Sequence, residues 1–311
     1  MARLWAISSY FNPVGYRRRV LNYHAFRRHL KVPLVTIELA YGPRFELNCD
    51  DADILIQLRG GDVLWQKERL LNIALQSVPP DCDRIAWLDC DIIFGNSDWA
   101  SRADRLLGEY PLLQLFTERV NLDRDAQADA LDGAPVAFSA ESLAYKAARG
   151  AATEEDFRMA GASLFRRTST GLAWAARRDV LDPDGLYDAC IIGNGDRVMA
   201  CAAYGRFAEG IEAAKMSGDR AAHYLAWAKP FFDRVRGSVG YVDGRISHLW
   251  HGDYKDRLHA ARHERLRDFG FDPSNDIALD ASGCWRWSSD KFAMHQWVQH
   301  YFESRNEDGD R

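Results

Sequence analysis

The sequence lacks the features that mark membrane and secreted proteins. It has 311 residues, and no apolar run is long enough to cross a bilayer. The first residues, Met1 to Ile7, are too few and turn polar too soon to form a signal peptide. We therefore expect a cytoplasmic protein.

Cysteine and net charge are also limited. The six cysteines are scattered without a Cys-x-x-Cys pair, which argues against a zinc site or a dense disulfide framework and favours reduced, mostly buried thiols. A net charge of −5 provides no overall attraction to nucleic acid. What remains is a globular chain, 47% hydrophobic, that can bury a full core.

Strand-like and helix-like segments alternate along the N-terminal part of the chain. Such alternation predicts an α/β fold with a doubly wound, mostly parallel sheet flanked by helices. Beyond residue 161 the pattern becomes mixed, with short strands near 171–177 and 246–250. The expected strands of the first part are Leu4–Ser9, Pro33–Leu39, Asp53–Leu58 and Arg84–Leu88, and the expected helices of the chain lie near 16–30, 62–77, 196–204, 219–235, 255–268 and 289–304.

The segment 117–160 interrupts this alternation. It is charged, alanine-rich and poorly periodic. We expect a loop with short helices there, of the kind that forms an active-site lid.

The most informative segment runs from Arg84 to Phe94, where an apolar run ends on Asp89 and Asp91. Other Asp-x-Asp pairs occur in the chain, but only this one follows four apolar residues. Residues i and i+2 of a strand point the same way, so both acids can address one cation at the carboxyl edge of the sheet. Two carboxylates suit Mg²⁺ or Mn²⁺, particularly when substrate phosphates fill the remaining positions.

A second segment places an acid at the start of a helix. In Gly193-Asn194-Gly195-Asp196 a glycine-rich turn puts Asp196 near the positive end of a helix dipole, which favours its ionised form. An ionised, positioned carboxylate is what a hydroxyl acceptor needs as a general base. The alternative is that Asp196 only caps its helix.

These segments resemble the glycosyltransferases of the GT-A fold. The resemblance is carried by Trp87–Asp91, by the helical run Lys67–Asn72 before it, and by Gly171–Asp196. The last block is similar to the Gly-x-x-Trp, Gly-x-Tyr-Asp and Gly-Gly-Glu-Asp motifs of galactosyltransferase and polypeptide sugar-transferase catalytic domains. This chain departs from that pattern in having Gly195 before Asp196, so that one acid remains where the family has two.

The resemblance spans about residues 4–252 and implies a fold, a donor and a set of sites. It implies a nucleotide-sugar-binding half (1–116) and an acceptor and catalytic half (117–252). Residues 253–311 lie beyond the resemblance, and we expect them to form a C-terminal helical extension. It also implies a nucleoside-diphosphate sugar, with a UDP-sugar favoured, and Mn²⁺ or Mg²⁺ held by Asp89 and Asp91. It places uracil or ribose contacts at Ser8, Ser9 and Asn12, for which a plain turn with local side-chain bonds is the alternative. The helix with Lys67, Arg69 and Asn72 precedes the motif and can reach the donor, and the alternative there is a solvated face. Asp89 and Lys255 complete the predicted donor contacts.

Two histidines, His248 and His251, complete the predicted metal site. They resemble the late histidine-containing strand of several GT-A enzymes. Because they are three apart, an extended strand would point them to opposite faces, so only one of them, preferably His248, is expected to bind the metal.

The sequence therefore predicts a metal-dependent, hexosyltransferase-like enzyme that transfers a sugar to a hydroxyl group, with inversion and with Asp196 as the base. The acceptor is left open among a glycan, a lipid-linked sugar, a small metabolite and a modified nucleic-acid base. Two alternatives remain. One is a phosphatase of the haloacid-dehalogenase type using Asp89 and Asp91, although that class carries its motif on the first strand. The other is a binding module without turnover.

Overall fold

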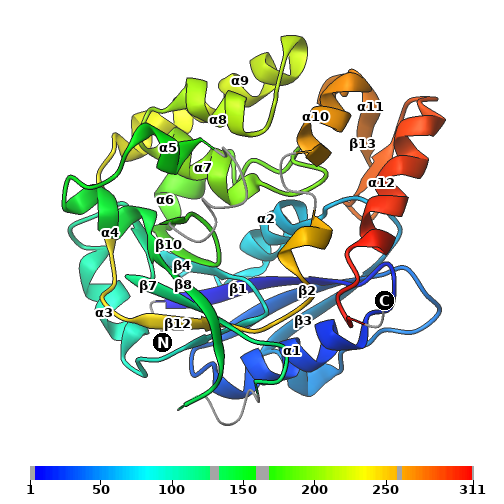
Figure 1. The fold of residues 1–311 in the computed structure, drawn as a ribbon. Helices are drawn as coiled ribbons and strands as arrows, with labels where there is room; N and C mark the ends of the chain where they lie inside the picture. Colours follow the sequence, from blue (N-terminus) through cyan, green and yellow to red (C-terminus); the bar gives the residue numbers. More distant parts are fainter. Residues whose placement is uncertain (1–3, 127–132, 159–167, 258–260, 310–311) are drawn as a thin grey trace.

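The computed structural model of the chain describes residues 4–126, 133–158, 168–257 and 261–309 (Figure 1). Its centre is a seven-stranded sheet in the order β11-β6-β10-β4-β1-β2-β3. The four strands expected in the N-terminal part are all present and run parallel to one another. They are β1 (Leu4–Phe11), β2 (Leu34–Ala40), β3 (Ile54–Arg59) and β4 (Arg84–Leu88).

Later parts of the chain extend the same sheet. The strand β10 (Ala173–Arg177) runs antiparallel to β4 and to β6 (Leu112–Gln114), and β11 (Val239–Tyr241) runs parallel to β6. Only one of the seven strands is therefore reversed. The expected α/β class with a mostly parallel sheet is confirmed.

Helices cover both faces of this sheet because side chains alternate along each strand. Ile85 and Trp87 of β4 belong to the larger apolar cluster, together with α2 (Lys67–Ser77) and α7 (Gly195–Ala203). Ala86 and Leu88 belong to a second cluster, which includes residues of α1 (Arg17–His29) and α3 (Trp99–Leu106). Figure 1 shows α1 and α2 on opposite sides of the strands. The end of β4 thus lies between two packed layers.

A second sheet corrects the expectation of a loop over 117–160. Its order is β5-β12-β7-β8-β9, and two of its strands fall in that segment. The strand β8 is half exposed and partly charged, so it lacks the apolar alternation by which strands are recognised. The strands are β5 (Ile92–Phe94), β7 (Glu118–Leu122), β8 (Val136–Ser142), β9 (Thr168–Ser169) and β12 (Arg245–His248), and the short helices α4 (Leu143–Ala148) and α5 (Glu154–Phe157) follow β8.

The C-terminal region is helical, as expected, but it also contains a hairpin of two strands. The hairpin explains why α2 begins at Lys67 instead of near residue 62. Asp62 and Gln66 bind the main chain of Trp285 in β14, which holds the segment before α2 in a non-helical conformation. The elements of this region are η3 (Tyr254–Arg257), α10 (Ala261–Asp268), α11 (Pro273–Asp276), β13 (Ile277–Leu279), β14 (Trp285–Trp287) and α12 (Phe292–Ser304).

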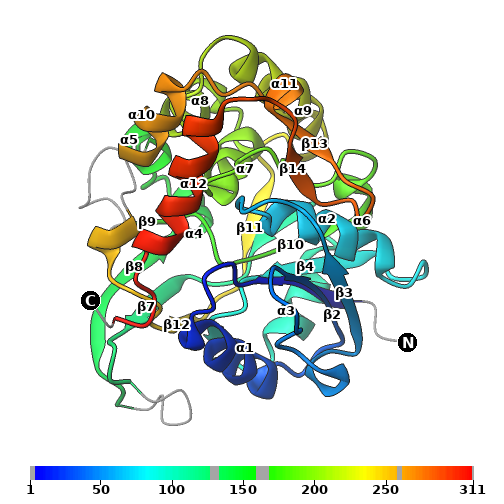
Figure 2. The same ribbon diagram turned by 90° about the vertical axis from the view of Figure 1, so that its right-hand side faces the viewer.

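The tail after α12 contacts the first turn of α1. Figure 2 shows it running from the end of α12 towards α1. The carboxylate of Asp308 accepts hydrogen bonds from the main-chain nitrogens of Arg17 and Arg18 at the first turn of α1. A carboxylate there offsets the positive end of the helix dipole. The C-terminal tail therefore packs against the first turn of α1.

The remaining elements complete the core. They are η1 (Cys49–Asp51), α6 (Arg178–Leu181), α8 (Phe207–Ala213) and α9 (Gly218–Val235). All six cysteines are free and four of them are buried, as the sequence predicts. Over the described ranges, the helices include none with the length and apolar character that a bilayer crossing requires.

Candidate functional site

A cavity of about 220 Å³ lies at the carboxyl ends of β1 and β4. This is the edge at which open α/β sheets bind their ligands. Its walls come from the N-terminal strands, from β7, β12 and α7, and from the C-terminal segment after β12. Among the residues that line it are Ser9, Lys67, Asp89, Asp91, Asp196, His248, His251 and Glu307.

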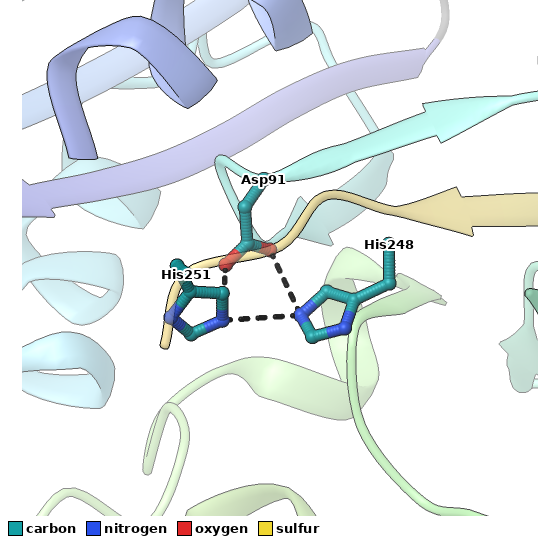
Figure 3. Close-up of side chains that lie close together, drawn as sticks. All are labelled: Asp91, His248 and His251. Carbon is teal, nitrogen blue, oxygen red and sulfur yellow. Dashed lines mark hydrogen bonds and ion pairs between the residues drawn. The ribbon is translucent and has the colours of Figure 1, made fainter. Parts of the chain in front are cut away.

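Asp91, His248 and His251 form what we call the metal cluster (Figure 3). One ligand atom from each residue lies within 4.8 Å of the other two. Nε2 of His251 is 3.0 Å from Oδ2 of Asp91 and 3.2 Å from Nε2 of His248. Nε2 of His248 is 3.7 Å from Oδ1 of Asp91. One carboxylate and two imidazoles therefore converge on one small space.

The expectation that the two histidines point to opposite faces is wrong. It assumed an extended strand, but β12 ends at His248. The next residue, Leu249, still donates its main-chain N–H to the carbonyl of Asp91, but residues 249–251 no longer belong to the strand. His251 consequently turns back to the same side as His248, and both imidazoles face Asp91.

The protonation states in the metal cluster suit a cation. Burial lowers the pKa of His248 to about 4, so its imidazole is neutral at pH 7. Burial alone would raise the pKa of Asp91, but the two imidazoles outweigh it and hold that pKa well below its usual range. Oδ1 of Asp91 is buried and has no hydrogen-bond partner among the described residues. A carboxylate oxygen left without a donor is the feature that a divalent cation would satisfy.

Neighbouring side chains set the direction of the imidazole lone pairs. Nη2 of Arg257 lies 3.0 Å from Nε2 of His251, and because a guanidinium only donates, this nitrogen must accept. Nδ2 of Asn121 lies 2.8 Å from Nδ1 of His248. Exchanging the two amide atoms lets the oxygen accept from Nδ1–H, which leaves the lone pair of Nε2 facing the cluster.

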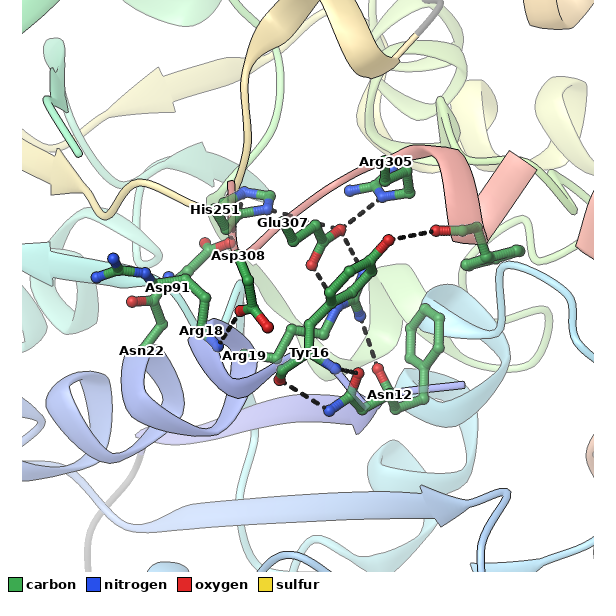
Figure 4. Close-up of polar contacts among 12 residues, drawn as sticks. Asn12, Tyr16, Arg18, Arg19, Asn22, Asp91, His251, Arg305, Glu307 and Asp308 are labelled. Carbon is green, nitrogen blue, oxygen red and sulfur yellow. Dashed lines mark hydrogen bonds and ion pairs between the residues drawn. The ribbon is translucent and has the colours of Figure 1, made fainter. Parts of the chain in front are cut away.

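A buried carboxylate, Glu307, lies behind the metal cluster (Figure 4). Its Oε1 is 3.9 Å from Nδ1 of His251, and it is held by Arg19 at 2.6 and 2.9 Å and by Arg305 at 2.5 Å. Burial would raise the pKa of Glu307, but the two arginines hold it well below its usual range. A carboxylate behind a metal-binding histidine orients the ring. Sequence reasoning missed this residue, because no local motif surrounds it and it reaches the site through the C-terminal tail.

Lys67, Glu68, Asp89 and Asp196 form a second group, which we call the base cluster. Nζ of Lys67 lies 2.5 Å from Oδ1 of Asp89 and 2.7 Å from Oδ2 of Asp196. Burial would lower the pKa of Lys67, but the two carboxylates raise it well above its usual value. Burial raises the pKa of Asp89 to about 7, and one ammonium shared between two carboxylates does not reverse this. Lys67 therefore links the first acid of the Asp-x-Asp pair to the predicted base.

Glu68 explains why a glycine stands at position 195, where the enzymes that the sequence resembles have an acid. A Cβ atom on Gly195 would lie 2.9 Å from Cγ of Glu68 and closer still to its carboxyl group. Glycine is therefore required if the Glu68 side chain is to pass there. Its two carboxyl oxygens are buried and have no hydrogen-bond partner among the described residues. Burial raises the pKa of Glu68 to about 8. The second acid near Asp196 is thus supplied by α2 and lies outside the cavity wall.

The predicted nucleotide contacts at the end of β1 differ in placement. Ser9 lines the cavity. Ser8 is fully buried and donates its hydroxyl to the carbonyl of Leu88, which joins β1 to β4. The side chain of Asn12 accepts from the main chain of Tyr16 and donates to Glu46, so it shapes the turn before α1. Of these three residues, Ser9 alone is in contact with the cavity.

The remaining predicted donor contacts lie away from the cavity wall. Arg69 binds Asp188 at 3.1 Å, and Asn72 binds Asp188 and the main chain of Leu186, so both residues join α2 to the segment before α7. Lys255 is exposed on η3, and its ammonium lies 3.8 Å from Asp253. The cavity wall therefore holds Lys67 from the predicted helix, but not Arg69, Asn72 or Lys255.

Searches for related proteins found no matching family model and no matching curated protein. Solved structures with similarity include glucosyl-3-phosphoglycerate synthase from Mycobacterium tuberculosis, in complex with Mn²⁺, uridine diphosphate and glucosyl-3-phosphoglycerate. It is 11% identical over 89% of this chain and 83% of that chain, with a TM-score of 0.40. A Desulfovibrio desulfuricans protein described as a nucleotide-diphospho-sugar transferase is 10% identical over 98% and 99% of the two chains, with a TM-score of 0.34.

A fragment of TarS from S. aureus in complex with UDP-GlcNAc is also similar. It is 11% identical over 88% of this chain and 74% of that chain, with a TM-score of 0.38. These names are those of nucleotide-sugar-dependent enzymes, the group that the sequence resembles.

Proposed function

We propose that this protein is a metal-dependent glycosyltransferase that moves a sugar from a nucleoside-diphosphate sugar, most simply a UDP-sugar, to a hydroxyl group of an acceptor. The observation that supports this best is the position of the metal cluster beside the base cluster in one cavity at the carboxyl edge of the sheet. A diphosphate-binding cation and a carboxylate acceptor for a hydroxyl proton are the two devices that such a transfer requires.

The donor set favours Mn²⁺ over Mg²⁺. Asp91 contributes a carboxylate and His248 and His251 contribute imidazoles, which suit Mn²⁺ better than the oxygen-seeking Mg²⁺. When bound, the cation neutralises the charge that develops on the departing diphosphate. Arg257, which now donates to His251, lies where it can turn to an oxygen of that diphosphate.

Asp196 is the proposed base, and Lys67 defines which of its oxygens acts. The ammonium engages Oδ2, so Oδ1 is the oxygen that accepts the proton of the acceptor hydroxyl. The sugar–oxygen bond of the donor breaks as the bond to the acceptor oxygen forms, and the diphosphate leaves with the electron pair. Such a single displacement inverts the anomeric centre.

The two alternative functions predict different outcomes. Asp89 and Asp91 follow the fourth strand in chain order, whereas the haloacid-dehalogenase motif follows the first strand. In addition, Oδ1 of Asp89 is occupied by the ammonium of Lys67, which would suppress attack by this carboxylate on a phosphate ester. A binding module would keep donor affinity without turnover.

Release of nucleoside diphosphate distinguishes these functions. UDP-, GDP- and dTDP-sugars are incubated with the protein and Mn²⁺, and released diphosphate and inorganic phosphate are measured separately, with EDTA as the metal-free arm. Metal-dependent release of UDP supports the proposal. Phosphate release from phosphate esters supports the phosphatase. Thermal stabilisation by UDP-sugars without any release supports the binding module.

A further inference from the structure

The wall of the cavity carries more positive than negative side chains. Seven arginine and lysine side chains line it, against four carboxylates. Three of the cations are neutralised in pairs and bridges, since Arg19 and Arg305 hold Glu307 and Lys67 lies between two aspartates. The complete set of cations is Arg19, Lys67, Arg119, Arg197, Arg257, Arg262 and Arg305, and the carboxylates are Asp89, Asp91, Asp196 and Glu307.

Arg197, on α7, is buried without an ion-pair partner among the described residues. It is only 4% exposed, and its Nη1 donates to the main-chain carbonyls of Asp156 and Phe157 at 2.8 and 3.3 Å. Burial lowers its pKa, Cys201 and Asp156 oppose that shift, and the nearby charge of Arg119 adds to it. Neutral carbonyls position this guanidinium but do not neutralise it.

Arg262, on α10, is in the same situation. It is 6% exposed and donates to the hydroxyl of Tyr301 and to the carbonyl of Arg257. A Cβ atom on Gly193, in the turn before Asp196, would lie 3.6 Å from Nη2 of Arg262. The guanidinium of Arg262 is therefore beside the turn that presents the proposed base.

A buried histidine, His263, lies beside Arg262, whose Nε is 3.4 Å from its Nε2. His263 is fully buried behind the cavity wall, and its pKa is held well below its usual value by burial and by Arg262, Arg220 and Arg197. Holding several buried cations close together without an opposing carboxylate is costly. A site that retains them is suited to a ligand that brings the negative charge with it.

We infer that the acceptor carries an oxyanion, a phosphate or a carboxylate, and that Arg197 and Arg262 bind it beside Asp196. This inference rests on the proposed function and names its acceptor class. Arginine suits the role because its planar group presents paired N–H donors to two oxygens. The oxyanion would hold the acceptor while one of the acceptor's hydroxyl groups faces Asp196. A neutral acceptor would leave both arginines without a negative partner, so we expect it to be excluded.

The elements that carry these arginines favour the acceptor over the donor. The donor diphosphate is expected at the metal cluster, beside Arg257. Arg197 is instead anchored to α5, and Arg262 is anchored to Tyr301 of α12 and to the carbonyl of Arg257. These anchors belong to segments that follow the nucleotide-binding strands in the chain.

The first test compares sugars that share one ring and differ at C6, where one is neutral and two carry an oxyanion. Glucose, glucose 6-phosphate and glucuronic acid are offered with a UDP-sugar and Mn²⁺, and transfer is measured for wild type, Arg197→Gln, Arg262→Gln and the control Arg267→Gln. Arg267 lies on the same helix as Arg262 but is exposed. We expect transfer only to the charged acceptors, with a loss of about ten- to a hundredfold in each cavity variant and no loss in the control. Preference for the phosphate or the carboxylate identifies the oxyanion, and equal use of glucose overturns the inference.

The second test separates this site from the donor site and from the proposed function. UDP affinity in the presence of Mn²⁺ should be unchanged in both cavity variants, and a parallel loss of UDP binding would assign the arginines to the donor diphosphate.

Inorganic phosphate without metal should raise the melting temperature of wild type and Arg267→Gln but not of Arg197→Gln. Arg197→Lys and Arg262→Lys keep the positive charge but lose the paired N–H donors, so they should bind phosphate weakly. They provide the same test if a glutamine variant fails to fold. If no UDP-sugar is turned over, the acceptor role fails with the proposed function, and the phosphate measurement still shows whether the arginines bind an oxyanion.

Discussion

The metal cluster and the base cluster lie side by side at one cavity, but they differ in whether a cationic side chain neutralises their carboxylates. Asp91 faces two imidazoles, of which His248 is neutral at pH 7. Among the described residues, no lysine or arginine forms an ion pair with this carboxylate. Asp89 and Asp196 share the ammonium of Lys67. The first group is therefore arranged to acquire a cation, whereas the second already contains one.

This difference separates the roles of the two acids of the Asp-x-Asp pair. A strand places both on one side, yet Asp91 joins the histidines and Asp89 joins Lys67. Asp89 was predicted to bind the metal together with Asp91, and that role stays a prediction. In the described structure it is the link through which the metal cluster and the base cluster adjoin.

The largest effect is expected from breaking the metal cluster. Asp91→Ala removes its only carboxylate, and the loss of a cation that acts in the transition state should lower the rate about a thousandfold. Diphosphate release with Mn²⁺ measures this, and circular dichroism checks that the fold persists. Asp125→Ala is the matched control, because Asp125 is exposed and belongs to another Asp-x-Asp pair. Wild-type turnover in Asp91→Ala would remove the metal site from the proposal.

The next effect concerns the base cluster. Asp196→Asn keeps the size of the side chain and its place at the start of α7 but removes its basicity, so transfer should fall about a hundredfold while UDP affinity stays normal. Transfer kinetics and calorimetry measure the two quantities. A product that retains the anomeric configuration of the donor would contradict the single displacement, whatever the rate of the variant.

The two histidines sharpen the comparison, because the structure assigns both to the metal cluster. His248→Ala and His251→Ala should each raise the Mn²⁺ concentration needed for half-maximal activity by about a hundredfold, without changing acceptor affinity. Titration of activity with Mn²⁺ provides the measurement. If only one variant responds, the other histidine is a neighbour of the metal and not a ligand.

A smaller effect is expected from the carboxylate behind His251. Glu307→Gln keeps the shape of the side chain but removes the charge that orients the imidazole, so Mn²⁺ affinity should fall about tenfold. The same variant leaves Arg19 and Arg305 without their carboxylate, so its melting temperature should also drop. Unchanged Mn²⁺ affinity together with a lower melting temperature would leave Glu307 a purely structural residue.

The smallest effect on activity, and a distinct effect on stability, is expected at Glu68. Because burial raises its pKa to about 8, the folded protein holds a proton on Glu68 that the unfolded chain loses above about pH 4.5. The free energy of unfolding should therefore fall as the pH rises from about 4.5 to about 8, by at most ~1.4 kcal/mol per pH unit from this group. Glu68→Gln should remove that slope in urea unfolding measured across the pH range. An unaltered slope would show that Glu68 is ionised in the folded state.

Local patterns predicted the parts of the site that belong to single elements. The apolar run before Asp89 predicted β4, and the glycine-rich turn before Asp196 predicted the start of α7, because strand alternation and helix initiation depend on near neighbours in the chain. The strand β8, within 117–160, escaped prediction because it is partly exposed and pairs through its main chain. Its sequence therefore carries little apolar periodicity.

By itself, the sequence determined the α/β alternation, the acids at the end of β4 and the absence of a second acid at Gly195. Tertiary structure alone decided which groups those acids meet. Lys67 reaches Asp196 across 129 positions, and Arg19 reaches Glu307 across 288. Glu68 enters the space that Gly195 leaves open, and the turn after β12 brings His251 to the side of His248. Such contacts depend on how the helices and the C-terminal tail pack on the sheet. The periodicity of a single segment carries no information about that packing.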